Sequence, residues 1–329
     1  MVESPVPATA STPQVIEFAR TSWQSYLIAG LLRCTLRPLA AVWPCGPRGA
    51  RALDRVLDAG ASVALLVHGR AMRDTARRLD VAGVPVLRVR AATVTAPERT
   101  ILHFHGGGFV FGTAKLYREF ALRLSAAADA EVLLFDYRHP PFTDVDTMIA
   151  DCLTVYRWAA TGYAPGRLAV SGDSAGSNLM FATVAGARSA GLPLPTAVAA
   201  QSGWLDMELP RRRWARQDPL FSVPFARRAA RRVRAGGPIP PVLCPLRIDP
   251  AGLPPVLLQL GRDEPIRAAN EAMADHLAAA GVPVRLELWA FQAHVFQLFG
   301  EVLPEGRAAI AAIAAFLDET SGSARPRSA

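Results

Sequence analysis

The stretch that most constrains the fold of this chain is Arg167 to Asn178, which reads RLAVSGDSAGSN. An apolar, β-favouring run ends at Gly172, and a helical pattern begins after Ser174. Gly172 and Gly176 flank Ser174 in a Gly-x-Ser-x-Gly spacing. A strand that turns directly into a helix strains the central residue, and larger side chains two positions away would collide. The stretch therefore predicts a strand–turn–helix unit that presents the Ser174 hydroxyl beyond a sheet, above a helix N-terminus.

The rest of the chain alternates strand-like and helix-like segments. This alternation is typical of a mostly parallel sheet with helices on both faces. The predicted strands are 84–94, 100–104, 131–135, 168–170, 197–201, 255–260 and 284–289. The predicted helices are 114–128, 147–160, 267–280 and 305–317. Residues 15–43 and 51–79 are predicted to be mainly helical, with Pro38 ending or kinking the first of these segments.

Composition narrows the class of protein. Half of the 329 residues are hydrophobic, which allows a sizeable core. The net charge of +8 comes almost entirely from arginine, and no zinc-finger spacing is present, so we expect no nucleic-acid partner. The cysteines lie far apart without a Cys-x-x-Cys pair, which indicates neither a disulfide framework nor a metal site and favours a cytoplasmic location. They are Cys34, Cys45, Cys152 and Cys244.

The N-terminal segment shows no signal-peptide pattern, and residues 1–13 are expected to form a disordered tail. The uncharged stretch from Thr21 to Leu32 is bounded by Arg20 and Arg33. We expect it to be too short to span a bilayer.

Chemically reactive residues follow several predicted strands. His105-Gly106-Gly107-Gly108 follows one strand, Ser174 another, Asp263 and Glu264 a later one, and His294 the last. In an open α/β sheet, reactive groups gather at the carboxyl ends of the strands. A serine, then an acid, then a histidine is the chain order of an α/β-hydrolase triad.

The sequence resembles the bacterial hormone-sensitive-lipase-like esterases of the α/β-hydrolase superfamily. The resemblance implies an α/β-hydrolase fold with a core of residues 84–204 and 251–318. It also implies a helical cap, with residues 14–83 as its N-terminal region and 205–250 as a cap insertion. The composition of residues 319–329 indicates a disordered tail. The matching residues are HGGGFVFG (105–112), DYR (136–138), GDSAG (172–176), SGWLD (202–206), GLPPVLLQLGRDEPIR (252–267) and WAFQAHVFQLF (289–299).

The residue types indicate how such a site would work. Ser174 needs a base to remove its proton, and His294 can do so because imidazole titrates near neutral pH. A carboxylate would hold the histidine tautomer. Adjacent side chains on an extended strand end point in opposite directions, so Asp263 and Glu264 cannot both fill this role. Glu264 is preferred as the triad acid, because it aligns with the family's acid and precedes Pro265. Asp263, which is shorter and stiffer, remains the alternative.

The glycine run supplies electrophilic groups. The N–H groups of Gly106, Gly107 and Ala175 are predicted to form an oxyanion hole. Each donor is expected to stabilise the transition state by about 3 kcal/mol. Aromatic residues beside the motifs are predicted to line an apolar substrate pocket. They are Phe109, Phe111, Phe142, Trp204 and Phe296.

The leading prediction is hydrolysis of a small ester with an apolar acyl group through an acyl-enzyme, without cofactor or metal. Acyl transfer, lactonisation or elimination by the same site remains an alternative. A ligand-binding module is a third reading, which the presence of serine, acid and histidine disfavours. The arginine-rich run Arg211 to Arg234 leaves open a contact with an anionic surface or an acyl carrier, and a homodimer is also left open.

Overall fold

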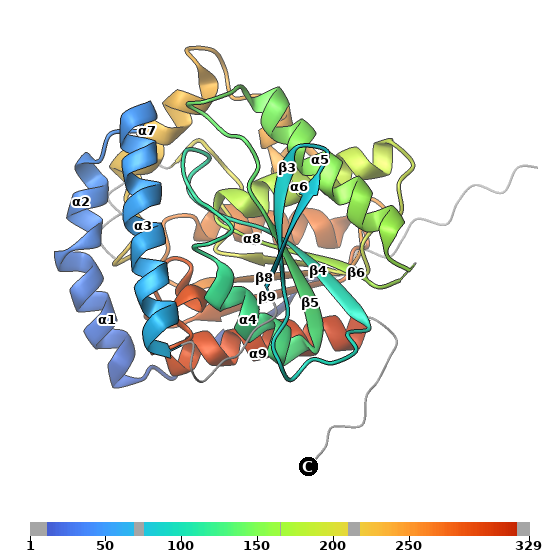
Figure 1. The fold of residues 1–329 in the computed structure, drawn as a ribbon, viewed down its shortest axis with the longest axis horizontal. Helices are drawn as coiled ribbons and strands as arrows, with labels where there is room; N and C mark the ends of the chain where they lie inside the picture. Colours follow the sequence, from blue (N-terminus) through green and yellow to red (C-terminus); the bar gives the residue numbers. More distant parts are fainter. Residues whose placement is uncertain (1–11, 69–75, 165, 210–217, 321–329) are drawn as a thin grey trace, which may run out of the picture.

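A mostly parallel sheet runs through the centre of the molecule (Figure 1). The computed structural model describes residues 12–68, 76–164, 166–209 and 218–320, and within them the sheet has nine strands. Their order across the sheet is β1-β9-β8-β7-β6-β4-β5-β3-β2. Neighbours from β1 to β5 pair in parallel, and β3 and β2 add an antiparallel edge. The bounds are β1 Gln14–Phe18, β2 Arg77–Val81, β3 Val84–Val89, β4 Arg99–Phe104, β5 Ala130–Phe135, β6 Leu168–Asp173, β7 Val198–Gln201, β8 Val256–Gly261 and β9 Val284–Trp289.

Helices cover both faces of this sheet. On one face α5 (Val145–Gly162), α6 (Ala175–Ser189) and α8 (Arg267–Ala279) share a core with the strands. On the other, α4 (Arg118–Ala128) and α9 (Pro304–Thr320) form a second core. Every residue of β5, β6 and β8 is buried, as expected for parallel strands covered on both sides. The predicted fold class is confirmed.

A helical cap stands beside the sheet. Its helices are α1 (Trp23–Cys34), α2 (Leu36–Val42) and α3 (Pro47–His68), which lie side by side at the left of Figure 1, and α7 (Val223–Arg234). The Arg228 guanidinium of α7 donates to the carbonyls of Ala40, Ala41 and Trp43 at 2.8–3.1 Å. Because these carbonyls end α2, Arg228 caps that helix and fixes it to α7. The described residues also contain three short 3₁₀ helices: η2 Pro241–Leu243, η3 Pro245–Arg247 and η4 Phe296–Phe299.

The predicted helical region 14–83 is only partly helical. Strands lie at its two ends, β1 and β2. β1 docks against β9, where Phe18 stacks on Trp289 with ring centroids 3.8 Å apart. The break between α1 and α2 falls at Thr35, because Pro38 sits in the first turn of α2, where a missing N–H costs little. At the other end α9 continues through Thr320, beyond the predicted start of the tail. Residues 1–11 and 321–329 lie outside the described residues.

The apolar N-terminal stretch is longer than the sequence suggested. Together α1 and α2 cover Trp23–Val42. Within the described residues, this one segment is long and apolar enough to cross a bilayer, by length and composition only.

Candidate active site

Ser174 sits at the sharp turn between β6 and α6, as the glycine spacing predicted. Its backbone has φ 50° and ψ −120°, a strained conformation for a residue with a side chain. A Cβ added to Gly176 would lie 2.0 Å from the carbonyl oxygen of Phe104. Only glycine fits at this crossing, so the turn can bring α6 directly under the end of β4.

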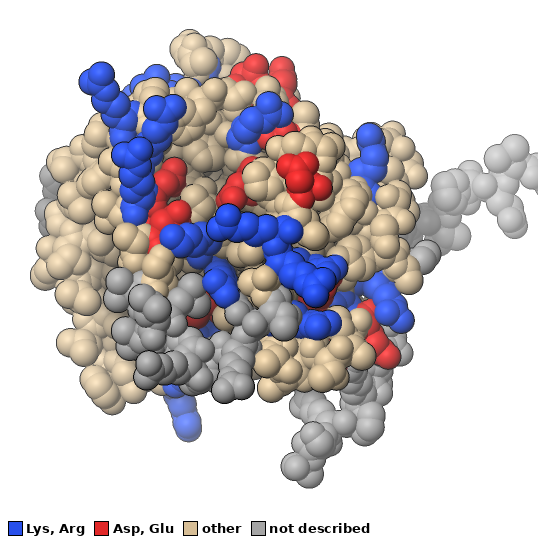
Figure 2. All heavy atoms as spheres, in the orientation of Figure 1, with Lys and Arg blue, Asp and Glu red and all other residues tan. Residues whose placement is uncertain are grey.

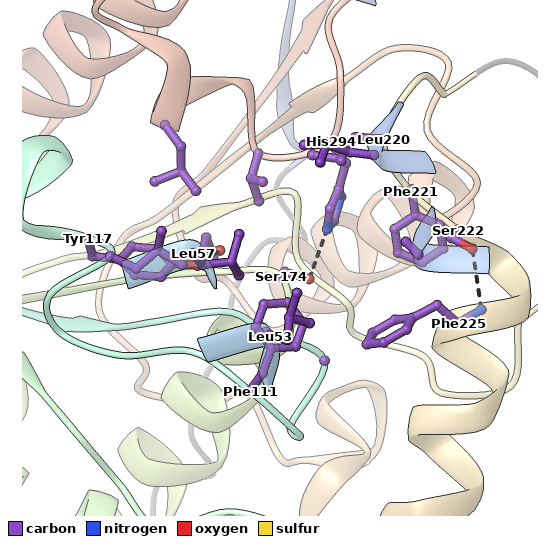
Figure 3. A pocket seen from close by; sticks show the side chains of 18 of the residues that line it. Leu53, Leu57, Phe111, Tyr117, Ser174, Leu220, Phe221, Ser222, Phe225 and His294 are labelled. Carbon is purple, nitrogen blue, oxygen red and sulfur yellow. Dashed lines mark hydrogen bonds between the residues drawn. The ribbon is translucent and has the colours of Figure 1, made fainter. Parts of the chain in front are cut away.

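Two further predicted residues meet Ser174. His294 follows β9, and its Nε2 lies 2.9 Å from Ser174 Oγ (Figure 3). Glu264 follows β8, and its Oε2 lies 2.6 Å from His294 Nδ1. All three side chains are buried. The structure thus joins serine, histidine and glutamate in one hydrogen-bonded chain at the carboxyl ends of three strands.

Glu264, rather than Asp263, contacts the histidine. Glu264 Oε1 also accepts hydrogen bonds from the Gly261 N–H and the Ser202 hydroxyl, each at 2.7 Å. Asp263 is about one third exposed and faces Arg262 at 4.0 Å. Adjacent side chains diverge here, as expected at an extended strand end. Ser202 belongs to the SGWLD motif but was not predicted as a site residue.

The charged groups around His294 raise the pKa of its imidazole. Burial alone would lower the pKa of the imidazole, but the Glu264 carboxylate beside Nδ1 raises it, with smaller contributions from Asp218 and Asp173. The net result is a pKa above the ordinary value of 6.5.

Asp218 is a site residue that the sequence analysis missed. Its Oδ2 accepts the backbone N–H of His294 at 2.9 Å, and its Oδ1 accepts the N–H groups of Leu220 and Phe221. The side chain is buried, and burial, followed by the charge of Glu264, raises the pKa of this carboxyl to about 6. Asp218 therefore links the segment before α7 to the loop after β9 that carries His294. One signal was available, since it is the only acid between residues 208 and 249.

The predicted oxyanion hole needs one correction. The Gly106 N–H is engaged elsewhere, because it donates to Asp173 Oδ1 at 2.8 Å and to the Tyr117 hydroxyl oxygen at 3.0 Å. Gly107 and Gly108 line the cavity that contains Ser174, whereas Gly106 does not. Ala175 begins α6, so its N–H has no acceptor within the helix.

An apolar cavity of about 420 Å³ lies over Ser174 and His294 (Figure 3). Its walls come from the cap and from the strand ends, and its volume falls within the usual range for small-molecule sites. The main apolar lining residues are Leu36, Leu39, Trp43, Leu53, Leu57, Phe111, Trp204, Leu220, Phe221 and Phe225.

The predicted pocket residues divide into two groups. Phe111 and Trp204 line the cavity. Phe109 and Phe296 do not: both are fully buried in the core, Phe109 against Trp204 and Phe296 against Trp289. Phe142 is 42% exposed and lies under the Arg51 guanidinium, outside the cavity. Nearness to a motif in sequence did not reveal the direction of these side chains.

The arginine-rich run is only partly within the described residues. Arg211 to Arg216 lie outside them. On α7, Arg231, Arg232 and Arg234 are exposed, whereas Arg228 is half-buried in the cap contact already described. Contact of this run with an anionic surface or an acyl carrier stays a prediction.

Comparison with known proteins agrees with this architecture. A family model for the alpha/beta hydrolase fold matches residues 101–298. An acetyl-hydrolase of Streptomyces hygroscopicus is 36% identical over 229 residues, which is 68% of this chain and 77% of the relative. The carboxylesterase/phospholipase LipF of Mycobacterium tuberculosis is 31% identical over 247 residues, which is 71% of this chain and 66% of LipF. The crystal structure of an esterase from the bacterial hormone-sensitive lipase family is 32% identical, with a TM-score of 0.79, over 92% of this chain and 100% of that chain.

The chain belongs to the alpha/beta hydrolase fold family. By homology it is an esterase of the bacterial hormone-sensitive lipase family, so the family and enzyme class predicted from the sequence are confirmed.

Proposed function

We propose that the protein hydrolyses small carboxylic esters through an acyl-enzyme formed on Ser174. The observation that carries this proposal is the hydrogen-bonded chain from Ser174 through His294 to Glu264, which faces an apolar cavity. The cavity wall suits an apolar acyl group, and the relative named acetyl-hydrolase supports a short one.

In the first half-reaction, Ser174 Oγ attacks the ester carbonyl carbon while its proton passes to His294 Nε2. Glu264 accepts a hydrogen bond from the Nδ1–H of His294 and stabilises the imidazolium. The N–H groups of Gly107, Gly108 and Ala175 bind the oxyanion, in place of the predicted set that included Gly106. The carbon–oxygen bond to the alcohol then breaks, and the leaving alcohol takes the proton from His294.

In the second half-reaction, water attacks the acyl-enzyme. His294 removes a proton from that water and returns it to Ser174 Oγ as the acid leaves. If a second alcohol reaches the acyl-enzyme before water does, the same steps give acyl transfer. Acyl transfer, a homodimer and a cytoplasmic location all stay predictions from the sequence.

The proposal is tested with nitrophenyl esters of increasing acyl length. We expect release of nitrophenol together with an equal amount of free acid, fastest for the short acyl chains. Adding an alcohol acceptor measures the competing transfer. Nitrophenol release that yields mainly a new ester, even when water is the solvent, would assign the protein to acyl transfer instead. Absence of turnover with every chain length would contradict the proposal.

The pH dependence of kcat/KM should follow the protonation of His294. The base must be neutral, and its pKa is raised, so kcat/KM should rise with pH through an apparent pKa above 6.5. The measurement is a profile of kcat/KM for a short nitrophenyl ester from acidic to alkaline pH, in buffers of constant ionic strength. A rate that already reaches its plateau below pH 6.5 would contradict a histidine held in this charged surrounding.

Asp218→Asn tests the contact that the sequence analysis missed. The variant loses a charged acceptor for the backbone of His294, worth roughly 1.5–3 kcal/mol, so we expect kcat/KM to fall about 10- to 100-fold. Because a negative charge near His294 disappears, the apparent pKa of the profile should also fall. Asp206→Asn is the control, since within the described residues Asp206 accepts a hydrogen bond from the nearby Glu208 N–H in its own loop and makes no contact with His294. An unchanged profile in Asp218→Asn would remove this residue from the site.

A further inference from the structure

The outer side of α1 and α2 carries large apolar side chains in contact with solvent. Trp23 is 69% exposed, Leu27 64% and Val42 76%. On α1 they fall at helical spacing, and together with two exposed residues of α2 they form the set that we call the α1–α2 face: Trp23, Tyr26, Leu27, Leu31, Leu39 and Val42. Monomeric soluble proteins rarely expose so many large apolar side chains together, so the face indicates an interaction surface.

Both ends of this helix pair are anchored to the rest of the molecule. At the start of α1, the hydroxyls of Ser22 and Ser25 donate to Glu305 Oε2 at 2.9 and 3.1 Å. At the end of α2, Arg228 holds the last carbonyls. The α1–α2 face is therefore a fixed part of the surface and not the exposed side of a loose segment.

The charged residues of α1, α2 and the chain that flanks them are all basic. Residues 18–53 contain no aspartate or glutamate, but they include five arginines: Arg20, Arg33, Arg37, Arg48 and Arg51. At the left of Figure 2, the edge of the molecule over α1 and α2 is mostly uncharged. Exposed apolar helices with tryptophan, tyrosine and arginine around them suit an interface between anionic headgroups and acyl chains.

The same helices border the cavity. Leu36, Leu39 and Trp43 of the α2 region line it, and Leu36 and Leu39 are also 42% and 47% exposed. A surface that covers the α1–α2 face would therefore lie beside the wall of the substrate cavity.

We propose that the α1–α2 face binds the surface of an anionic lipid bilayer, with α1 and α2 lying in the plane of the interface. A second copy of the chain is a poorer occupant, because a two-fold contact would place the basic residues of both helix pairs at one apolar interface, and residues 18–53 contain no acid to pair with them. A spanning arrangement would pull α1 and α2 away from Glu305 and Arg228 and leave these buried or part-buried contacts unmade. The binding surface does not depend on the chemistry proposed for Ser174.

The test is flotation of the full chain with vesicles of phosphatidylcholine, with and without phosphatidylglycerol. We expect binding to the anionic vesicles that weakens as salt rises, since screening shortens the reach of the arginines. The variant Trp23→Gln/Leu27→Gln/Leu31→Gln should bind at least about tenfold more weakly. Val302→Gln, at an exposed apolar residue that is not part of the α1–α2 face, is the matched control and should bind like wild type.

A second variant keeps the test independent of folding. Arg20→Gln/Arg37→Gln should lose the preference for anionic vesicles, whereas Arg157→Gln, at an exposed arginine of α5, should keep it. Thermal unfolding and hydrolysis of a soluble ester check that each variant is folded. Equal vesicle binding by wild type and the Trp23 triple variant overturns the proposal. So does a wild-type dimer that the triple variant converts to monomer without lipid binding, or protein that resists alkaline extraction from the vesicles.

Discussion

We expect the Ser174→Ala variant to hydrolyse no ester at a measurable rate while unfolding at the wild-type temperature. The substitution removes a single hydroxyl at the end of the cavity, and that hydroxyl is the proposed acceptor of the acyl group. Loss of the nucleophile in a serine triad costs on the order of 10⁶-fold in kcat. No strand pairing or core contact changes, so the free energy of unfolding should stay close to that of wild type.

Covalent labelling gives an independent measure of the same role. A fluorophosphonate should modify Ser174 in the wild-type protein and nothing in the variant, as read by peptide mass spectrometry. Ser189→Ala is the control, because Ser189 is exposed at the end of α6 and its hydroxyl donates to the Ala185 carbonyl of the same helix. Labelling at another serine, or near-normal turnover by folded Ser174→Ala, would exclude the acyl-enzyme on this residue.

The second large effect is expected for Glu264→Gln, which should lower turnover by up to roughly four orders of magnitude. A neutral amide cannot stabilise the imidazolium, and it can hold His294 in the wrong tautomer. The variant also disturbs the contacts of Glu264 with Ser202 and Gly261, so some loss of stability is expected. The pKa of His294 should fall, because the nearest negative charge is gone.

Asp263→Asn is the matched control for this variant. Asp263 lies next in the chain but is partly exposed beside Arg262, so its amide should leave kcat and the pH profile nearly unchanged. Comparing kcat, thermal unfolding and pH profiles of both variants separates a lost charge from a damaged fold. A large loss in Asp263→Asn with near-normal Glu264→Gln would reverse the assignment of the acid.

The strand ends were predictable from sequence because their geometry is local. The spacing around Ser174 requires a strand–turn–helix, and β9 begins and ends at the predicted residues. The sequence could rank Glu264 above Asp263 as the triad acid but could not decide between them. That decision depends on how one strand end is rotated toward His294.

Features that depend on contacts distant in sequence were missed. β1 is five residues long and includes Gln14 and Glu17, so its partner β9, not its own pattern, makes it a strand. The hydrogen bond from the Gly106 N–H to Asp173 joins two separate motifs, and the sequence of neither motif indicates it. Phe109 lies beside the glycine run yet points into the core, because the turn reverses its direction.

The pairing of β1 with β9 has a consequence for synthesis of the chain. Gln14 and Arg285 are partners 271 positions apart, so β1 must wait for β9 to leave the ribosome before the two strands can pair. At about 5–20 residues per second, that wait is on the order of tens of seconds. During this time the serines at the start of α1 also lack Glu305. A chain truncated before β9 would therefore leave β1 and the start of α1 without their partners, although Arg228 would still hold the end of α2.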